Sequence, residues 1–239
     1  MGFDMLERVV TPKIKKLLRP TKLRVLAVSE FLKKQREGIA WDPFATHVPV
    51  LLGVSALVRV RRVVEFGCGL YSTHIFLNPS LFPHLQYLHS FDNDSAWANK
   101  VRDEVSDKKR FKLTLVSGSI SSIVSGVEFS DYDLVFIDDS VTVEERAETI
   151  SAVASGCSQS NIIVIHDFEQ EPYRVAASTL PSRYTIDALV PHTGILWKDA
   201  PINVHKLERL NALIDRRRRR LGPQKLRRWS SYITRGLKK

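Results

Sequence analysis

The stretch VVEFGCGLYSTHIF, residues 63–76, joins an apolar, strand-like run to a loop with two glycines. In a doubly wound α/β sheet, glycines after the first strand let backbone amides approach a ligand closely. A dinucleotide fingerprint has a third glycine where this chain has Ser72. In addition, Glu65 places a carboxylate just before Gly67 and Gly69, where it opposes a pyrophosphate. The pattern therefore favours a ligand with an ammonium or sulfonium centre over a dinucleotide.

Strand-like runs alternate with helix-like segments over the centre of the chain. Five runs are rich in β-branched and aromatic residues: 62–66, 85–92, 111–116, 132–138 and 161–167. Near-continuous apolar runs of this kind are typical of parallel strands covered on both faces. Two later strand-like runs, joined by the turn PHTG, predict a hairpin whose last strand is antiparallel to the others. The sequence thus predicts an α/β fold with a doubly wound, mostly parallel sheet of about seven strands and an antiparallel last strand.

Charge divides the chain into three parts. Residues 1–40 carry ten Lys/Arg against four Asp/Glu, and residues 205–239 carry thirteen against two, whereas acidic residues prevail between them. We therefore expect a basic N-terminal helical arm at 1–43, a globular domain at 44–204 and a basic C-terminal helix or tail at 205–239. The dense basic runs within 216–239 suit an anionic partner, either nucleic acid or a membrane surface, and a merely solvated tail is the alternative.

Cysteine content and hydropathy bear on the compartment. Cys68 and Cys157 are too few for a disulfide framework and match no zinc spacing, which favours a reducing environment. The N-terminal residues form no uninterrupted apolar leader, and the longest apolar stretch, 48–58, is too short to span a bilayer. We expect a cytoplasmic protein that can associate with a membrane surface through its basic arms.

The segment VEFGCG, residues 64–69, matches the first motif of the class I S-adenosylmethionine-dependent methyltransferases, which reads acidic residue, any residue, Gly, any residue, Gly. The chain resembles this family over about residues 44–199, and the predicted antiparallel last strand fits the seventh strand of the family. The resemblance implies a Rossmann-like fold, S-adenosylmethionine as the cofactor and methyl transfer (EC 2.1.1 type) as the activity.

Cofactor roles follow from the resemblance. It places Glu65 near the methionine end of the cofactor and has Gly67 and Gly69 permit a close approach. It assigns the ribose hydroxyls to Asp92 at the end of the second strand, where a carboxylate can accept two hydrogen bonds from a diol. Ser119, after the third strand, is expected near the adenine ring.

Two further residues of the opening stretch, Ser72 and Thr73, are expected to cap the next helix and to present its amides to the cofactor carboxylate. The structural alternatives are a surface ion pair of Glu65 with a neighbouring arginine and a helix-capping role for Asp92.

Methyl transfer requires a nucleophile aligned with the methyl group and, for a hydroxyl nucleophile, removal of its proton. Candidate groups follow the fourth and fifth strands, namely Asp138, Asp139, His166, Asp167, Glu169 and Glu171. We expect His166 to be the general base, oriented by a carboxylate, because its reference pKa is near neutrality. Asp138 and Asp167 are expected beside it in the catalytic group, with Asp138 also near the cofactor. A structural His166 is the alternative.

The strand ends FIDDS and VIHD resemble those of the catechol O-methyltransferase-like and macrocin O-methyltransferase-like enzymes. Some of these enzymes hold a divalent cation with carboxylates at the two strand ends. The resemblance implies that Mg²⁺, if required, is held by Asp138 and Asp167. Because His166 is a poor partner for Mg²⁺, we favour a reaction without metal and keep Mg²⁺ as the alternative.

The leading hypothesis is O-methylation of a small molecule, in a pocket lined by Trp41, Phe44 and His47. One alternative is an RNA or macromolecule methyltransferase that uses the basic arms, although the fourth strand is followed by IDDS rather than an N/D-P-P-Y motif. Another is a non-catalytic module of the same fold, tethered to a membrane or partner. An intact set of Glu65 and Asp92 with the loop glycines would be superfluous in such a scaffold.

Overall fold

Seven strands form one sheet in a computed structural model that describes residues 43–139 and 142–219. The strands are β1 (Arg62–Phe66), β2 (Tyr87–Asp92), β3 (Phe111–Leu115), β4 (Leu134–Ile137), β5 (Ile162–His166), β6 (Ser182–Ile186) and β7 (Thr193–Trp197). Their order is β3-β2-β1-β4-β5-β7-β6. Strands β1 to β5 pair in parallel, and β7 is antiparallel to both of its neighbours. The predicted fold class is confirmed, and the five predicted parallel strands lie within two residues of their predicted bounds.

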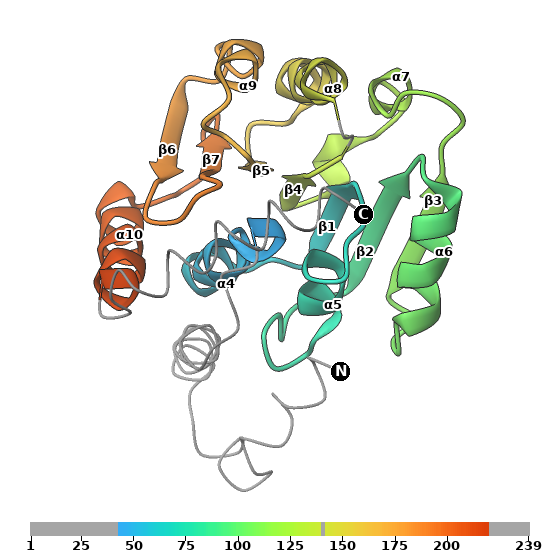
Figure 1. The fold of residues 1–239 in the computed structure, drawn as a ribbon, viewed down its shortest axis with the longest axis horizontal. Helices are drawn as coiled ribbons and strands as arrows, with labels where there is room; N and C mark the ends of the chain where they lie inside the picture. Colours follow the sequence, from blue (N-terminus) through green and yellow to red (C-terminus); the bar gives the residue numbers. More distant parts are fainter. Residues whose placement is uncertain (1–42, 140–141, 220–239) are drawn as a thin grey trace, which may run out of the picture.

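Helices cover both faces of the sheet. They are α4 (Val48–Leu57), α5 (Ser72–Leu77), α6 (Ser95–Glu104), α7 (Ser121–Val124), α8 (Val143–Gly156), α9 (Glu171–Ala176) and α10 (Val204–Arg219), with short 3₁₀ turns at Pro43–Ala45 and Phe129–Asp131. Figure 1 shows α7, α8 and α9 along one side of the sheet and α4, α5 and α10 along the other. Two separate buried apolar clusters match this division, because one includes side chains of α4, α5 and α10 and the other side chains of α7 and α8.

The strand order reverses between β1 and β4, and the candidate residues gather at this edge. In the register of the sheet, Glu65 of β1 lies beside Ser90 of β2 and Phe136 of β4. Asp138 directly follows β4, and His166 ends β5. Ligands in open α/β sheets bind beyond the carboxyl ends of the strands at such a switch point.

Helix α8 contributes an arginine to the same edge. Its buried positions are Arg146, Thr149, Ile150, Val153 and Ala154. Their spacing of three and four residues defines one face of a helix. The charged side chain of Arg146 is therefore carried to the inside, above the ends of β4 and β5.

Helix α10 packs on the same core as α4. Its residues Leu207 and Ile214 are fully buried, and Leu210 lies so close to Gly53 of α4 that a Cβ there would come within 2.2 Å of it. No helix in the described ranges is both long and apolar enough to cross a membrane. The expected N-terminal arm and the basic runs beyond residue 219 lie outside the described residues.

Candidate active site

The carboxylate of Glu65 is buried beneath the glycine loop. The hydroxyls of Thr73 (2.8 Å) and Ser90 donate hydrogen bonds to its Oε2. Its Oε1 is buried and has no hydrogen-bond partner among the described residues. Burial raises the pKa of Glu65 to about 7, against the opposing effect of hydrogen bonds from the neighbouring hydroxyls. The carboxylate is therefore ready to receive a buried donor, and a cationic one best of all.

The expectation that Ser72 and Thr73 cap the following helix is wrong. Helix α5 begins at Ser72 with Tyr71 in the capping position, and no side chain caps it. The Thr73 hydroxyl instead donates to Glu65, and it accepts a hydrogen bond from the amide of Gly69 at 3.1 Å. A surface ion pair of Glu65 is also excluded, because this side chain is fully buried.

Gly67 makes the sharpest turn of the loop. Its φ is +84°, and a Cβ at this position would lie 2.3 Å from the backbone oxygen of Asp138. Only a glycine accommodates both the left-handed conformation and this contact. The loop after β1 thus packs directly on the backbone that follows β4.

Asp92 ties the glycine loop to the end of β2. Its Oδ2 accepts a hydrogen bond from the amide of Cys68 (2.9 Å), and its Oδ1 accepts one from the amide of Asp94 (2.8 Å). The cap of α6 is Asp94, whose side chain accepts from the amides of Ala96 and Trp97. Asp92 is thus not the cap of α6, and it contacts the glycine loop through the Cys68 amide. Its binding of the ribose hydroxyls stays a prediction.

Ser119 lies in the turn between β3 and α7. Its hydroxyl is 2.8 Å from that of Ser121. The neighbouring Gly118 has a φ of +92°, and a Cβ there would meet no atom within 4 Å. The amide of Asn93 donates to the Gly118 carbonyl at 3.1 Å, which brings this turn to the end of β2. There is therefore open space beside Gly118, close to the end of β2 that carries Asp92.

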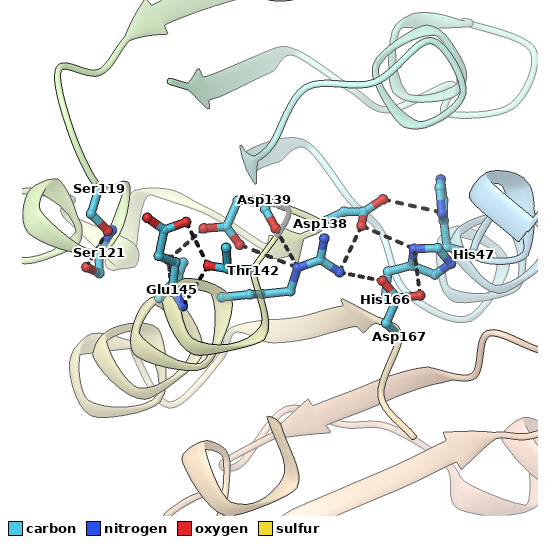
Figure 2. Close-up of polar contacts among 11 residues, drawn as sticks. His47, Ser119, Ser121, Asp138, Asp139, Thr142, Glu145, His166 and Asp167 are labelled. Carbon is cyan, nitrogen blue, oxygen red and sulfur yellow. Dashed lines mark hydrogen bonds and ion pairs between the residues drawn. The ribbon is translucent and has the colours of Figure 1, made fainter. Parts of the chain in front are cut away.

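Asp138 and His166 form a hydrogen-bonded pair at the ends of β4 and β5 (Figure 2). Nδ1 of His166 lies 3.1 Å from Oδ1 of Asp138, and Nε2 lies 2.9 Å from the hydroxyl of Thr46. Thr46 in turn donates to the carbonyl of Pro43, so the Nε2 proton can point to Thr46 while Nδ1 faces Asp138. The His166 ring is buried, whereas 22% of the Asp138 side chain is exposed. Asp138 is accordingly the more solvent-accessible member of the pair.

The two members shift each other's pKa. Burial raises the pKa of Asp138, but the His166 charge and hydrogen bond, together with Arg146, bring it down to about 2. Burial lowers the pKa of His166, but the charge and hydrogen bond of Asp138 outweigh this effect and raise it above its usual value. The pair therefore has one strong site for a proton, on His166 Nδ1.

Arg146 joins the carboxylates that follow β4 and β5. Its NH1 lies 3.2 Å from Oδ1 of Asp138 and donates to Oδ2 of Asp167 at 2.7 Å. Its Nε donates to the backbone oxygen of Asp139. Asp167 has a φ of +57°, an unusual conformation that points to local constraint at this strand end. Three anchors therefore fix the position of the guanidinium.

Asp139 and His47 are buried groups with unused polar atoms. Asp139 Oδ2 accepts from the hydroxyl of Thr149 at 2.6 Å, whereas Oδ1 has no hydrogen-bond partner among the described residues. Burial raises the pKa of Asp139 to about 7. Both ring nitrogens of His47 lack a hydrogen-bond partner within the same residues, and burial together with the His166 charge lowers its pKa to about 3. His47 is thus a neutral ring packed edge-on against His166, with Nδ1 at 3.8 Å from Asp138 Oδ2.

Two solved structures that share this architecture are named as O-methyltransferases. A Staphylococcus aureus protein provisionally named a caffeoyl-CoA O-methyltransferase superposes with a TM-score of 0.51 and 10% identity over 82% of this chain and 100% of its own. A Klebsiella pneumoniae protein provisionally named an O-methyltransferase gives 0.50 and 16% over 82% and 96%. The chain has the class I methyltransferase fold.

Further comparisons cover two more solved structures, the family models and the curated proteins. Cofactor-bound Rv0187 from MTB superposes on the methyltransferase fold of this chain with a TM-score of 0.51 and 16% identity, over 82% of this chain and 95% of its own. The chain spans 60% of the length of an O-methyltransferase family protein from Burkholderia thailandensis, at a TM-score of 0.49 and 12% identity over 75% of this chain. The sequence matches no family model and no curated protein.

Within this methyltransferase fold, most predicted site residues lie at one edge of the sheet. Asp138, His166 and Asp167 come together, and His47 joins them from the start of α4. Phe44 is 74% exposed, and Trp41 lies outside the described residues. The remaining two candidates face other partners: Glu169 accepts from the amide of His192, and Glu171 pairs with Arg174 at the surface.

Two side chains of this edge were missing from the prediction. Arg146 was not singled out, although it is the single basic residue of α8 and has apolar residues four and seven positions further on. That spacing alone places it on the buried face. Thr46, the partner of His166 Nε2, has no such signal, because its contact spans 120 residues of sequence.

Magnesium does not fit between Asp138 and Asp167 as they stand. Mg²⁺ requires carboxylate oxygens at about 2.0–2.1 Å in a near-octahedral shell. Both carboxylates already bind the Arg146 guanidinium. Ligand atoms of His47, Asp138 and His166 lie within 4.8 Å of one another, but this mostly imidazole set suits Zn²⁺ more than Mg²⁺.

Glu65 should make the stability of the protein depend on pH. Its pKa is about 7 in the folded state, against 4.5 for an ordinary glutamate, so between these values the folded protein keeps a proton that the unfolded chain releases. The stabilisation is complete below about pH 4.5 and is lost as the pH rises through about 7. Glu65→Gln keeps the shape of the side chain and removes its titration. Urea unfolding from pH 4 to 8 should therefore show a shallower decline for this variant, and equal slopes for both proteins would contradict the assignment.

Proposed function

We propose that this protein is an S-adenosylmethionine-dependent O-methyltransferase that acts on a small molecule. The observation that carries the proposal is the buried Glu65 carboxylate, whose Oε1 is unpartnered next to a glycine loop in a methyltransferase fold. An orphaned buried oxygen is costly unless a ligand donor or its own proton satisfies it. A cationic amine that binds here stabilises the carboxylate and completes its hydrogen bonds.

The chain's own groups fit the other parts of the cofactor. Gly67 gives the loop its left-handed turn against the Asp138 backbone, which places the amides that follow it at the switch point of the sheet. Asp92 has one hydrogen bond on each oxygen and keeps a lone pair on each for a ribose diol. The open turn at Ser119 is the expected neighbour of the adenine ring. When bound, S-adenosylmethionine supplies a methyl group that its sulfonium already activates.

The Asp138–His166 pair would take up the acceptor's proton. In the proposed reaction the exposed Asp138 carboxylate holds the acceptor hydroxyl, and the proton passes to His166 Nδ1, 3.1 Å from Oδ1. The O–H bond breaks, an N–H bond forms, and the resulting imidazolium is stabilised by Asp138. Thr46 holds the opposite ring nitrogen and so keeps the ring oriented. Asp167 is expected to act through Arg146, which connects it to Asp138.

Calorimetry provides the first test. S-adenosylmethionine and its demethylated product, S-adenosylhomocysteine, should both bind to the wild-type protein, and Mg²⁺ should leave both affinities unchanged. A panel of hydroxylated small molecules, screened for release of S-adenosylhomocysteine, would then find the acceptor class. If neither ligand binds, the proposal fails.

Asp92→Ala should weaken S-adenosylmethionine binding by at least about tenfold, or roughly 1.4 kcal/mol, through the lost hydrogen bonds to ribose. The matched control is Asp94→Ala, which removes the cap of α6 but not the contact with the glycine loop. This control should lose about 1 kcal/mol of stability and retain its affinity for the cofactor. Wild-type affinity in Asp92→Ala would remove that residue from the cofactor site.

A further inference from the structure

A positive charge already lies between the two strand-end carboxylates. NH1 of Arg146 contacts Asp138 Oδ1 at 3.2 Å and Asp167 Oδ2 at 2.7 Å. These two side chains follow adjacent parallel strands, so their oxygens face the same space beyond the sheet. A divalent cation bound by both carboxylates would have to take the place of this guanidinium.

We propose that Arg146 is a built-in substitute for a divalent cation, so that the site binds no metal between Asp138 and Asp167 and positions its base with a guanidinium instead. Arg146 is thus a positioning residue, since it acts through Asp138 rather than on the acceptor itself. The metal-binding part stands on geometry alone, whereas the positioning part rests on the proposed function.

The surroundings of Arg146 hold it in this position. Its side chain is only 8% exposed and projects from the buried face of α8. The guanidinium carbon lies 5.7 Å from the centre of the Tyr173 ring, and Nε is tied to the Asp139 backbone oxygen. Arginine cannot lose its proton in a protein, and its planar fork suits two carboxylates at once. The positive charge of Arg146 is therefore permanent and is held against both carboxylates.

The charge balance of the site also disfavours a metal while Arg146 is present. Asp138 and Asp167 supply two negative charges, and Arg146 neutralises one of them. A divalent cation would therefore face a guanidinium at contact distance with too little negative charge to offset it. Removing the guanidinium leaves two carboxylate oxygens that both lay within 3.2 Å of the same NH1 atom, and carboxylate oxygens are ligands that Mg²⁺ and Mn²⁺ prefer.

The test is to create the metal site by removing Arg146. Binding of Mn²⁺ is followed by the loss of the free-ion signal in electron paramagnetic resonance, for the wild type, Arg146→Ala and the double variant Arg146→Ala/Asp138→Asn. We expect Arg146→Ala to bind Mn²⁺ at least about tenfold more tightly than any binding seen with the wild type, and the double variant to lose this gain. Arg174→Ala, which removes an exposed arginine from the neighbouring α9, is the matched control and should resemble the wild type.

The test does not depend on whether Arg146→Ala folds, because a second variant is available. If Arg146→Ala fails to fold, Arg146→Gln keeps more of the volume, removes only the charge and serves in its place. Circular dichroism establishes that each variant is folded before metal is added. Folded Arg146 variants that bind no more Mn²⁺ than the wild type would overturn the proposal.

A second titration, with Zn²⁺, examines the imidazole-rich group. A Zn²⁺ complex of the wild type that disappears in both Asp138→Asn and Asp167→Asn would place a cation between these two carboxylates, which also contradicts the proposal. The result is independent of cofactor binding: failure of the calorimetry would refute the methyltransferase function and leave the Mn²⁺ outcome valid. Conversely, a wild type that binds both S-adenosylmethionine and Mn²⁺ at Asp138 would refute only the substitution by Arg146.

Discussion

Gly67→Ala should destabilise the folded protein by about 2–5 kcal/mol. Two costs add at this position. A left-handed conformation costs an alanine about 1–2 kcal/mol, and the new Cβ would lie 2.3 Å from the backbone oxygen of Asp138. Overpacking of this kind typically costs about 1–3 kcal/mol. Denaturant unfolding followed by circular dichroism measures the loss as a lower midpoint.

Gly118→Ala separates the two costs. Gly118 has a φ of +92°, similar to that of Gly67, but a Cβ there meets no atom within 4 Å. This variant should lose only the conformational part, about 1–2 kcal/mol. Equal losses in the two variants would mean that the contact between the glycine loop and the Asp138 backbone is not tight.

His166→Gln should lower the rate of methyl transfer by about 10²–10⁴-fold, as is typical when a proton acceptor is removed. Its affinity for S-adenosylmethionine should stay close to that of the wild type, because the ring contacts Asp138 and Thr46 rather than the glycine loop. The measurement is single-turnover transfer to the acceptor found in the screen. An unchanged rate would make His166 a structural residue.

A matched control and a pH profile distinguish catalysis from stability. His89 is also hydrogen-bonded on both ring nitrogens, to Tyr132 and Thr114, so His89→Gln should reduce stability without changing the rate. In the wild type, the rate should fall at low pH as His166 becomes protonated, with a pKa above the usual 6.5 because of Asp138. Asp138→Asn should slow the reaction and move the remaining acidic limb to lower pH.

Strand ends could be predicted from the sequence because they depend on local patterns. The apolar runs fixed the strands, and their order placed Glu65, Asp92, Asp138 and His166 at one edge of the sheet. The motif around Gly67 indicated that another group approaches the backbone closely there. In the structure, the Asp138 carbonyl is such a group. Residues of this kind are found by sequence because each sits at the boundary of a regular element.

Contacts between distant elements could not be predicted in the same way. The partner of His166 Nε2 is Thr46, which precedes the sheet by many residues. Arg146 was overlooked because a charge on a helix usually indicates the solvated face, and only its register with Ile150 and Val153 shows that it points inward. The hydroxyls of Ser72 and Thr73 resembled helix caps, but neither caps α5, and the Thr73 hydroxyl donates to the buried Glu65 carboxylate instead.

The contact between Gly67 and the Asp138 carbonyl has a consequence for how this protein could change over time. It joins main chain to main chain, so its spacing depends on no side-chain length. In the proposed reaction, the loop that receives the methyl donor and Asp138, which holds the acceptor hydroxyl, are therefore kept at a fixed separation. Substitutions elsewhere can alter which acceptor enters, while the separation itself is inherited unchanged.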